Sequence, residues 1–201
     1  MACSSPSGSI ERAVPADAVI DATVLVGDDL GRRIQRDPGA WPVQLRPARA
    51  IILPDGVLRA DVGADLRVDD RPGVARHLYR SQLEELWRGL DDLGFGDPAV
   101  GDYDGNLGRL VPDDDEVIQI LALQRGGRDW AIVRRFEVSP DTTPAEAAGL
   151  EDARMRSAIR RLAALAWAFD APPDDTVAFP ERYDFGPDPW ARYRGPGKAD
   201  G

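Results

Sequence analysis

The stretch that decides the fold is a β-hairpin, in which Ala48-Arg49-Ala50-Ile51-Ile52-Leu53 leads through Pro54-Asp55-Gly56 into Val57-Leu58-Arg59-Ala60-Asp61-Val62. Both arms are rich in the apolar and β-branched residues that favour strands. Asp-Gly supplies the positive φ that a tight turn requires. The two arms are therefore predicted to pair as antiparallel strands.

A helix is predicted after this hairpin. Ser81-Gln82-Leu83-Glu84 has the pattern of a capping box, in which the Ser hydroxyl and the Glu carboxylate satisfy free amides at the helix start. One apolar stripe follows at helical spacing: Leu83, Leu86, Trp87, Leu90 and Leu93. Gly94 is a natural C-cap, and Phe95 is positioned for the hydrophobic contact beyond it. The helix is amphipathic and is expected to lie on a sheet.

A second hairpin and helix follow. Glu116–Leu123 turns at Arg125-Gly126-Gly127-Arg128 into Trp130–Phe136. The incoming strand is apolar on both faces apart from Gln119, which favours a central position in the sheet. Thr143-Pro144-Ala145-Glu146 is another capping box, with Pro at the first helical position. The helix is expected to run from there to about Ala168, with a possible interruption near Gly149. Its apolar stripe is Met155, Ile159, Leu162, Ala166 and Phe169.

The chain before the first hairpin adds one strand. Val19–Val26 alternates Ile20, Ala22, Val24 and Val26 with polar Asp21 and Thr23, which is the period of a half-buried strand. Gly27–Trp41 is interpreted as a loop that could hold a helical turn over Asp29–Ile34. The predicted fold is α+β: a mainly antiparallel sheet of about five strands in the order β-ββ-α-ββ-α, with two helices packed on one face.

Composition divides the chain into three parts. Residues 1–16 are predicted to be a flexible tether, residues 17–169 a single α+β domain, and residues 170–201 a Pro-rich aromatic tail. The tail is too aromatic for an inert linker. Its aromatic residues are candidate contacts with a partner, or they close over the domain itself: Tyr183, Phe185, Trp190 and Tyr193.

Charge and composition exclude several classes of function. The formal net charge is −10, which repels phosphate backbones, so no nucleic-acid partner is expected. One Cys, Cys3, and one His, His77, leave little room for a zinc site or for a nucleophile–His pair. No stretch approaches the roughly 18 apolar residues of a membrane span. We therefore expect no catalytic residues and no cofactor, and the oligomeric state stays open.

Two acidic patterns are candidate sites. Asp102, Asp104, Asn106 and Asp113 partly match the ligand spacing of a calcium loop, although the loop lacks its glycine and the final Glu. A solvated acidic loop is the alternative. The run Asp113–Glu116 could supply a carboxylate pair for a hydrolase, or charged residues that protect the following strand from aggregation.

The N-terminus resembles the end of a bacterial lipoprotein signal. Met1-Ala2-Cys3-Ser4-Ser5-Pro6-Ser7-Gly8-Ser9 has a small residue, a Cys that could be lipidated, and a Ser/Gly/Pro tether. It departs from that pattern in having no basic start and no apolar run before Cys3. If the true start lies upstream, the resemblance implies a lipid-anchored or periplasmic protein of the cell envelope. Otherwise a cytoplasmic location is expected.

Two further resemblances concern the body of the chain. Residues 45–59, the helix 81–93 and Leu165-Ala166-Trp167-Ala168 are similar to uncharacterised small lipoproteins of GC-rich bacteria such as planctomycetes, which implies an envelope location. The order of strand, helix ending in Gly-Phe, hairpin and final helix also resembles the emfourin class of metalloprotease inhibitors. We therefore expect a non-catalytic envelope domain that binds a protein or surface component. A protease-inhibitor-like domain and a carboxylate-pair hydrolase are the alternatives.

Overall fold

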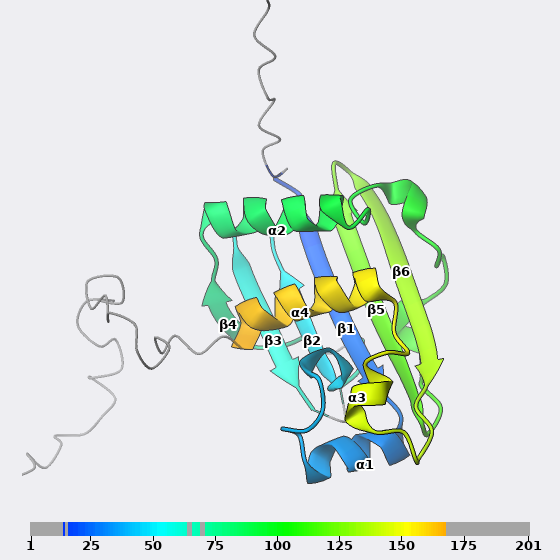
Figure 1. Ribbon diagram of the computed structural model, residues 1–201. Helices are drawn as coiled ribbons and strands as arrows, with labels where there is room; N and C mark the ends of the chain where they lie inside the picture. The colour runs from blue at the N-terminus through cyan, green and yellow to red at the C-terminus, as the bar shows by residue number, and fades with distance from the viewer. Residues whose placement is uncertain (1–13, 15, 64–65, 69–70, 168–201) are drawn as a thin grey trace, which may run out of the picture. The chain divides into compact units, whose positions relative to one another are not determined.

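A six-stranded sheet forms the centre of the protein (Figure 1). The computed structural model describes residues 14, 16–63, 66–68 and 71–167. The strands are β1 (Val19–Val26), β2 (Ala48–Ile52), β3 (Val57–Val62), β4 (Val74–His77), β5 (Glu116–Arg125) and β6 (Arg128–Glu137). They lie in the order β4-β3-β2-β1-β5-β6, and every neighbouring pair is antiparallel. The predicted α+β class is confirmed, with one strand more than expected.

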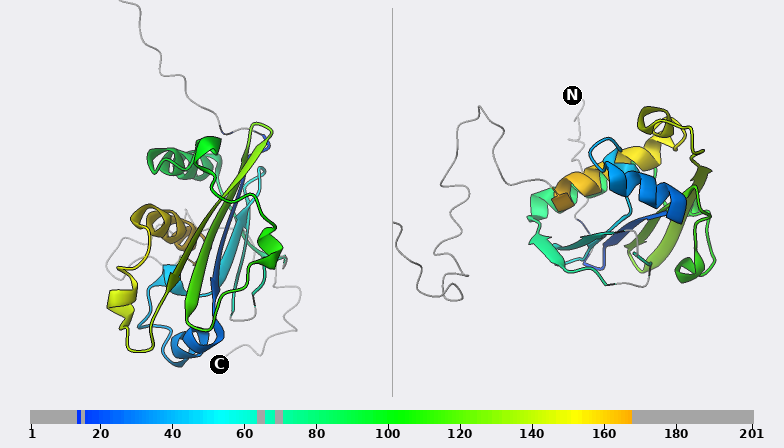
Figure 2. Two further views of the ribbon diagram at one scale, coloured as in Figure 1. Left: turned by 90° about the vertical axis from the view of Figure 1, so that its right-hand side faces the viewer. Right: turned by 90° about the horizontal axis from the view of Figure 1, so that it is seen from below.

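Helices cover one face of this sheet. They are α1 (Asp28–Arg36), α2 (Arg80–Asp92), α3 (Pro144–Ala147) and α4 (Ala153–Trp167). The chain also forms short 3₁₀ turns at Val43–Leu45, Pro98–Val100 and Leu107–Arg109. Seen edge-on, α2 and α4 lie on the same side of the sheet, while the segment around Leu107–Arg109 lies on the other side (Figure 2). We call the side covered by α2 and α4 the helix face, and the opposite side the open face.

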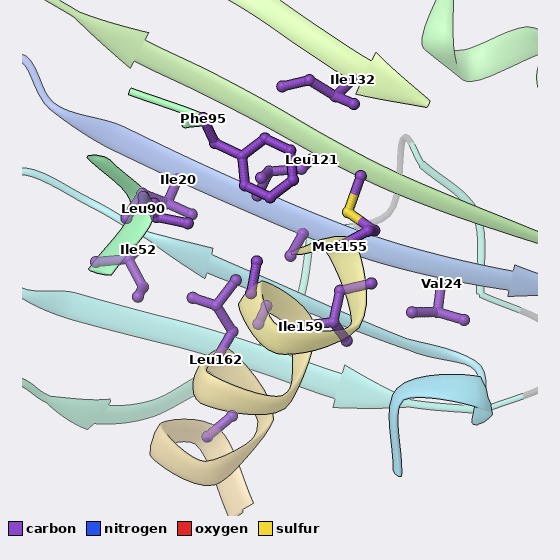
Figure 3. Close-up of a cluster of buried hydrophobic side chains, with 14 of the residues drawn as sticks. Ile20, Val24, Ile52, Leu90, Phe95, Leu121, Ile132, Met155, Ile159 and Leu162 are labelled. Carbon is purple, nitrogen blue, oxygen red and sulfur yellow. The ribbon is translucent and has the colours of Figure 1, made fainter. Parts of the chain in front are cut away.

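The main core fills the space between the sheet and these two helices (Figure 3). Met155, Ile159 and Leu162 of α4 are buried against the sheet, as the predicted stripe requires. The sheet contributes alternate residues, such as Ile20 and Leu121, because successive side chains on a strand point to opposite faces. Burying these side chains is the main stabilising term of the fold.

Both predicted hairpin turns are present, and each needs glycine. Gly56 has φ 86°, and Gly126 and Gly127 have φ 61° and 71°. The Asp17 carboxylate accepts hydrogen bonds from the amides of Gly126 (3.1 Å) and Gly127 (2.6 Å). These bonds, above all the one from Gly127, lower the pKa of Asp17. They fix the chain that enters β1 to the β5–β6 turn.

The loop predicted at Gly27–Trp41 contains a full helix, α1, which is longer than the turn expected over Asp29–Ile34. Two acidic residues in its first turn suit the positive end of the helix dipole. Leu30 and Ile34 are buried, and this pair, one helical turn apart, is the signal for the helix.

The capping box predicted at Ser81–Glu84 is wrong by two residues. The helix α2 begins at Arg80 after the N-cap Tyr79, and Gln82 rather than Glu84 accepts a hydrogen bond from the Tyr79 amide (2.9 Å). The reason lies before the helix. The Leu78 amide donates to the Gly56 carbonyl, so the chain leaves the sheet at Leu78 and the helix starts two residues earlier than the sequence pattern suggests.

The sixth strand, β4, has no counterpart in the sequence prediction. Its four residues are mostly exposed and include Arg76 and His77, so no apolar alternation marks it. It forms because it pairs with β3, where the register shifts between Leu58 and Arg59.

The capping box at Thr143–Glu146 is confirmed, and so is the interruption near Gly149, which separates α3 from α4. Several predictions lie outside the described residues: the tether up to residue 13, Cys3, Phe169, and the tail aromatics Tyr183, Phe185, Trp190 and Tyr193.

Candidate functional site: a groove on the open face of the sheet

A second, smaller apolar cluster lies on the open face. Leu25, Ile118 and Ile120 of β1 and β5 are buried there. No helix longer than one 3₁₀ turn covers them among the described residues. Side chains from two irregular segments and from β6 pack on them instead: Val68, Leu107, Leu110 and Val133. Thr23 and Leu25 are buried as well, so β1 is covered on both faces rather than half-buried.

The two irregular segments leave a groove of about 500 Å³ between them, at the end of the sheet where β1 runs into α1. We call it the open-face groove. Its apolar lining comes from the end of β1, from residues near the start of β2, and from both segments: Leu25, Pro47, Leu66, Val68, Leu110 and Val111. Val111 is 73% exposed, which makes it an accessible apolar side chain at the mouth of the groove.

The end of the groove is built by close backbone contacts. The amides of Asp29 and Leu30, in the first turn of α1, donate to the Asp114 carbonyl at 3.0 and 3.1 Å. The Gly27 amide donates to the Glu116 carbonyl at 2.9 Å. A Cβ at Gly27 would lie 1.7 Å from the Asp113 carbonyl oxygen, so only glycine fits there. These contacts fix the position of residues 113–114 relative to β1.

The charged side chains of the groove are mainly acidic. Asp28 and Asp114 line it, with Arg67 as the cation among the lining residues. Both carboxylates are exposed, and neither makes a hydrogen bond or ion pair with another described residue. The amides in the first turn of a helix can bind an anion. In α1, the amides of Asp29 and Leu30 donate to the Asp114 carbonyl instead, so this helix start is not an anion site.

A second hollow of about 380 Å³ lies on the same face, towards the other end of β1. Val19 and Asp21 of β1, Tyr103 and Leu107 are among its lining residues, and Asp104 and Asp129 lie at its edge. Asp21 is paired with Arg49, whose Nη2 lies 2.6 Å from its carboxylate. Asp104 and Asp129 are exposed and have no such partner among the described residues.

The predicted calcium-loop residues are engaged separately. Asp102 accepts a hydrogen bond from the Val133 amide and pairs with Arg134. The Asn106 side chain accepts a hydrogen bond from the Gly108 amide (2.9 Å), which begins a 3₁₀ turn. Asp104 lines the second hollow, and the Asp113 carbonyl lies against Gly27, a residue that lines the open-face groove. Within the described ranges, no three His, Cys, Asp or Glu residues come together in a group that could hold a metal ion.

The acidic run before β5 is divided among different partners. Arg135 makes two hydrogen bonds of 2.7 Å to the buried Glu116 carboxylate, and this interaction holds the pKa of Glu116 below its ordinary value. Asp115 lies 3.6 Å from Arg33. Asp113 and Asp114 are exposed. The side chains of this run therefore serve local pairing and the groove rim.

A buried polar cluster on the helix face was not anticipated from the sequence. Gln44 and Gln119 donate to the two oxygens of the Glu151 carboxylate at 2.8 and 2.9 Å, and Gln119 also donates to the Gln44 carbonyl. All three side chains are buried. The polar Gln119 in an apolar strand was the available signal. The cluster joins β5 to the segments that precede β2 and α4, which is a structural role.

No protein-family model matches the chain, and no curated protein matches it. None of the helices in the described part of the chain is long and apolar enough to cross a membrane.

Proposed function

We propose that this protein is a non-catalytic binding domain that holds a segment of another protein in the open-face groove. The observation that carries the proposal is the groove itself, a hollow of about 500 Å³ lined by both apolar side chains and exposed carboxylates. Its size falls in the range of ligand sites. An accessible apolar side chain beside it, Val111, is typical of a surface that a partner covers.

The charge arrangement supports binding over catalysis. A general acid must hold a proton near neutral pH, which requires a carboxyl with a raised pKa. The buried Glu116 has a lowered pKa instead, because Arg135 stabilises its charged form. The hydrolase alternative needs two carboxylates that share a cleft. In the groove, the candidates are Asp28 and Asp114, both exposed to solvent.

We also propose that the protein works in the cell envelope. The support is the N-terminal sequence around Cys3, which resembles the region that follows a lipoprotein signal. Labelling cells with a fatty acid and comparing the wild type with Cys3→Ser tests it. Absence of label from the wild-type protein would contradict lipid anchoring.

Peptide selection tests the binding proposal directly. Random peptides of about ten residues, displayed on phage, are selected on the full chain and counter-selected on Val111→Arg. Val111→Arg places a charged side chain on the apolar mouth of the groove, so peptides that use the groove should bind it at least about tenfold more weakly. Leu150→Arg is the matched control, because Leu150 is 50% exposed and lies between α3 and α4. Equal binding to the wild type and both variants would contradict the proposal.

A protease-inhibitor-like domain is the second candidate. The observation that favours it is β4, a mostly exposed strand at the edge of the sheet whose Val74 is 54% exposed. Such an edge can pair with a strand of another protein. Titrating the full chain into a zinc metalloprotease of the thermolysin type measures this. An unchanged proteolytic rate at micromolar protein would remove this candidate.

A further inference from the structure

The open-face groove and the second hollow carry the same charge. Asp28 and Asp114 lie at the groove, and Asp104 and Asp129 lie at the second hollow. All four are exposed, and none has an ion pair with another described residue. The lining residues include fewer cations than carboxylates. Arg67 lines the groove, and Arg49 is paired with Asp21. A ligand that covers both hollows therefore meets an excess of negative charge.

β1 runs beneath both hollows, and between them it is covered by the segment around Leu107, so a ligand that reaches both hollows must cross that segment. Val19 and Asp21 line the second hollow, and Leu25 lines the groove. All three are at odd positions of one strand, so they share the open face. At about 3.3 Å per residue, Val19 and Leu25 are about 20 Å apart along the strand. An extended peptide of about six residues spans that length.

We infer that the occupant of this face is a linear segment of a partner protein that carries Lys or Arg beside an apolar residue. The inference rests on the proposed function and names the chemistry of its partner. The apolar residue occupies the groove against Leu25, Val68 and Leu110, and the cationic residues face the four carboxylates. A second copy of this chain is disfavoured as the occupant, since two chains of net charge −10 repel each other.

Phosphate-bearing ligands are disfavoured for a related reason. The exposed carboxylates repel them, and the first amides of α1 are bonded to the Asp114 carbonyl. Charge complementarity of this kind mainly speeds association and selects the partner, while the apolar contact slows dissociation. Binding should therefore weaken as salt is added.

The peptides selected on the wild type and lost on Val111→Arg provide the test. Their sequences should carry net positive charge with an apolar residue between or beside the cations. In fluorescence anisotropy with the full chain, Asp28→Asn/Asp114→Asn should weaken binding about tenfold, and Asp104→Asn/Asp129→Asn should weaken it about threefold. Asp92→Asn/Asp141→Asn is the matched control, because both residues are exposed and neither lines a hollow. That control should leave binding unchanged.

The outcomes separate this inference from the proposed function. Groove-dependent peptides that are neutral or acidic would overturn the inference and leave the proposed function standing. Basic peptides whose affinity is the same for both Asp-to-Asn pairs and for the control would also overturn it. Recovery of no peptide sensitive to Val111→Arg would overturn the proposed function itself.

Discussion

The two faces of the sheet are built in different ways. On the helix face, α2 and α4 press regularly spaced apolar side chains onto the strands, and residues such as Leu121 and Met155 have no exposed surface. On the open face, irregular segments rest on a small cluster around Leu25, Ile118 and Ile120 and leave two hollows. One face supplies most of the stability, and the other leaves space that a ligand can fill.

The difference follows from the kind of structure that covers each face of the sheet. Regular helices pack closely on a sheet and leave little room for a ligand. Loops fixed at a few points can leave hollows without weakening the core, which is why binding sites are often found on loops held by a rigid scaffold. Here the fixed points are the backbone contacts of Gly27, Asp29 and Leu30 with residues 113–116.

Core truncation on each face gives the largest expected effect. Leu121→Ala, at a fully buried position on the helix face, should lower the free energy of unfolding by about 3 kcal/mol. Leu110→Ala, half-buried on the open face, should lower it by about 1 kcal/mol. Urea unfolding followed by circular dichroism measures both. Equal losses of unfolding free energy would show that the two faces contribute equally to stability, contrary to this expectation.

Substitution of Gly27, which precedes α1, should lower the stability by an intermediate amount. Gly27→Ala forces the new Cβ against the Asp113 carbonyl, so unfolding should become easier by about 2 kcal/mol and the groove end should move. Gly31→Ala is the matched control, because a Cβ at Gly31 meets no atom within 4 Å. Within the helix it should stabilise the protein by about 0.5 kcal/mol. Thermal unfolding measures the signs, and a stable Gly27→Ala variant would contradict the close contact.

The smallest effect concerns the ion pair of the open face. Arg135 lowers the pKa of Glu116 in the folded protein, so the pair stabilises the fold above the ordinary Glu pKa of about 4.3. That contribution is lost as pH falls through the lowered value. Glu116→Gln should cost about 1 kcal/mol at neutral pH, a modest amount because the Arg135 side chain is 47% exposed.

The check for this pair is urea unfolding of the wild type and Glu116→Gln at neutral pH and near pH 3. The difference between the two proteins should shrink at the lower pH, because below the ordinary Glu pKa of about 4.3 the unfolded chain binds a proton at this position more readily than the folded protein does. A difference that stays constant with pH would mean that Glu116 acts through packing alone.

Much of the helix face was predictable from the sequence. The Asp55-Gly56 and Gly126-Gly127 turns, the stripe of α4 and the capping box at Thr143 are local patterns, and local patterns are what a single sequence carries most clearly. The short strand β4 was missed because it depends on pairing with β3, a contact that leaves no periodic signal in four residues. The start of α2 also depends on a contact with the sheet. The Leu78 amide bonds to the Gly56 carbonyl, so α2 begins earlier than the local pattern predicts.

The candidate site was predictable only in part. The sequence draws attention to the acidic residues between Asp102 and Glu116, and two of them, Asp104 and Asp114, line the hollows. Their arrangement depends on how residues 101–115 lie across the open face. Asp28, which completes the groove rim, is far away in sequence and lies in the segment that the sequence predicts to be a loop. Only the folded backbone brings Asp28 and Asp114 together.

The hydrogen bonds between Asp17 and the β5–β6 turn fix the start of β1 at one end of the sheet. Val14 is held nearby, because its carbonyl accepts a hydrogen bond from Arg80 at the start of α2. From this end, β1 carries the chain about 20 Å across the sheet, from Val19 to Leu25, where the open-face groove begins. A domain held by its N-terminal segment would therefore present the groove at the far end, facing away from whatever surface holds it.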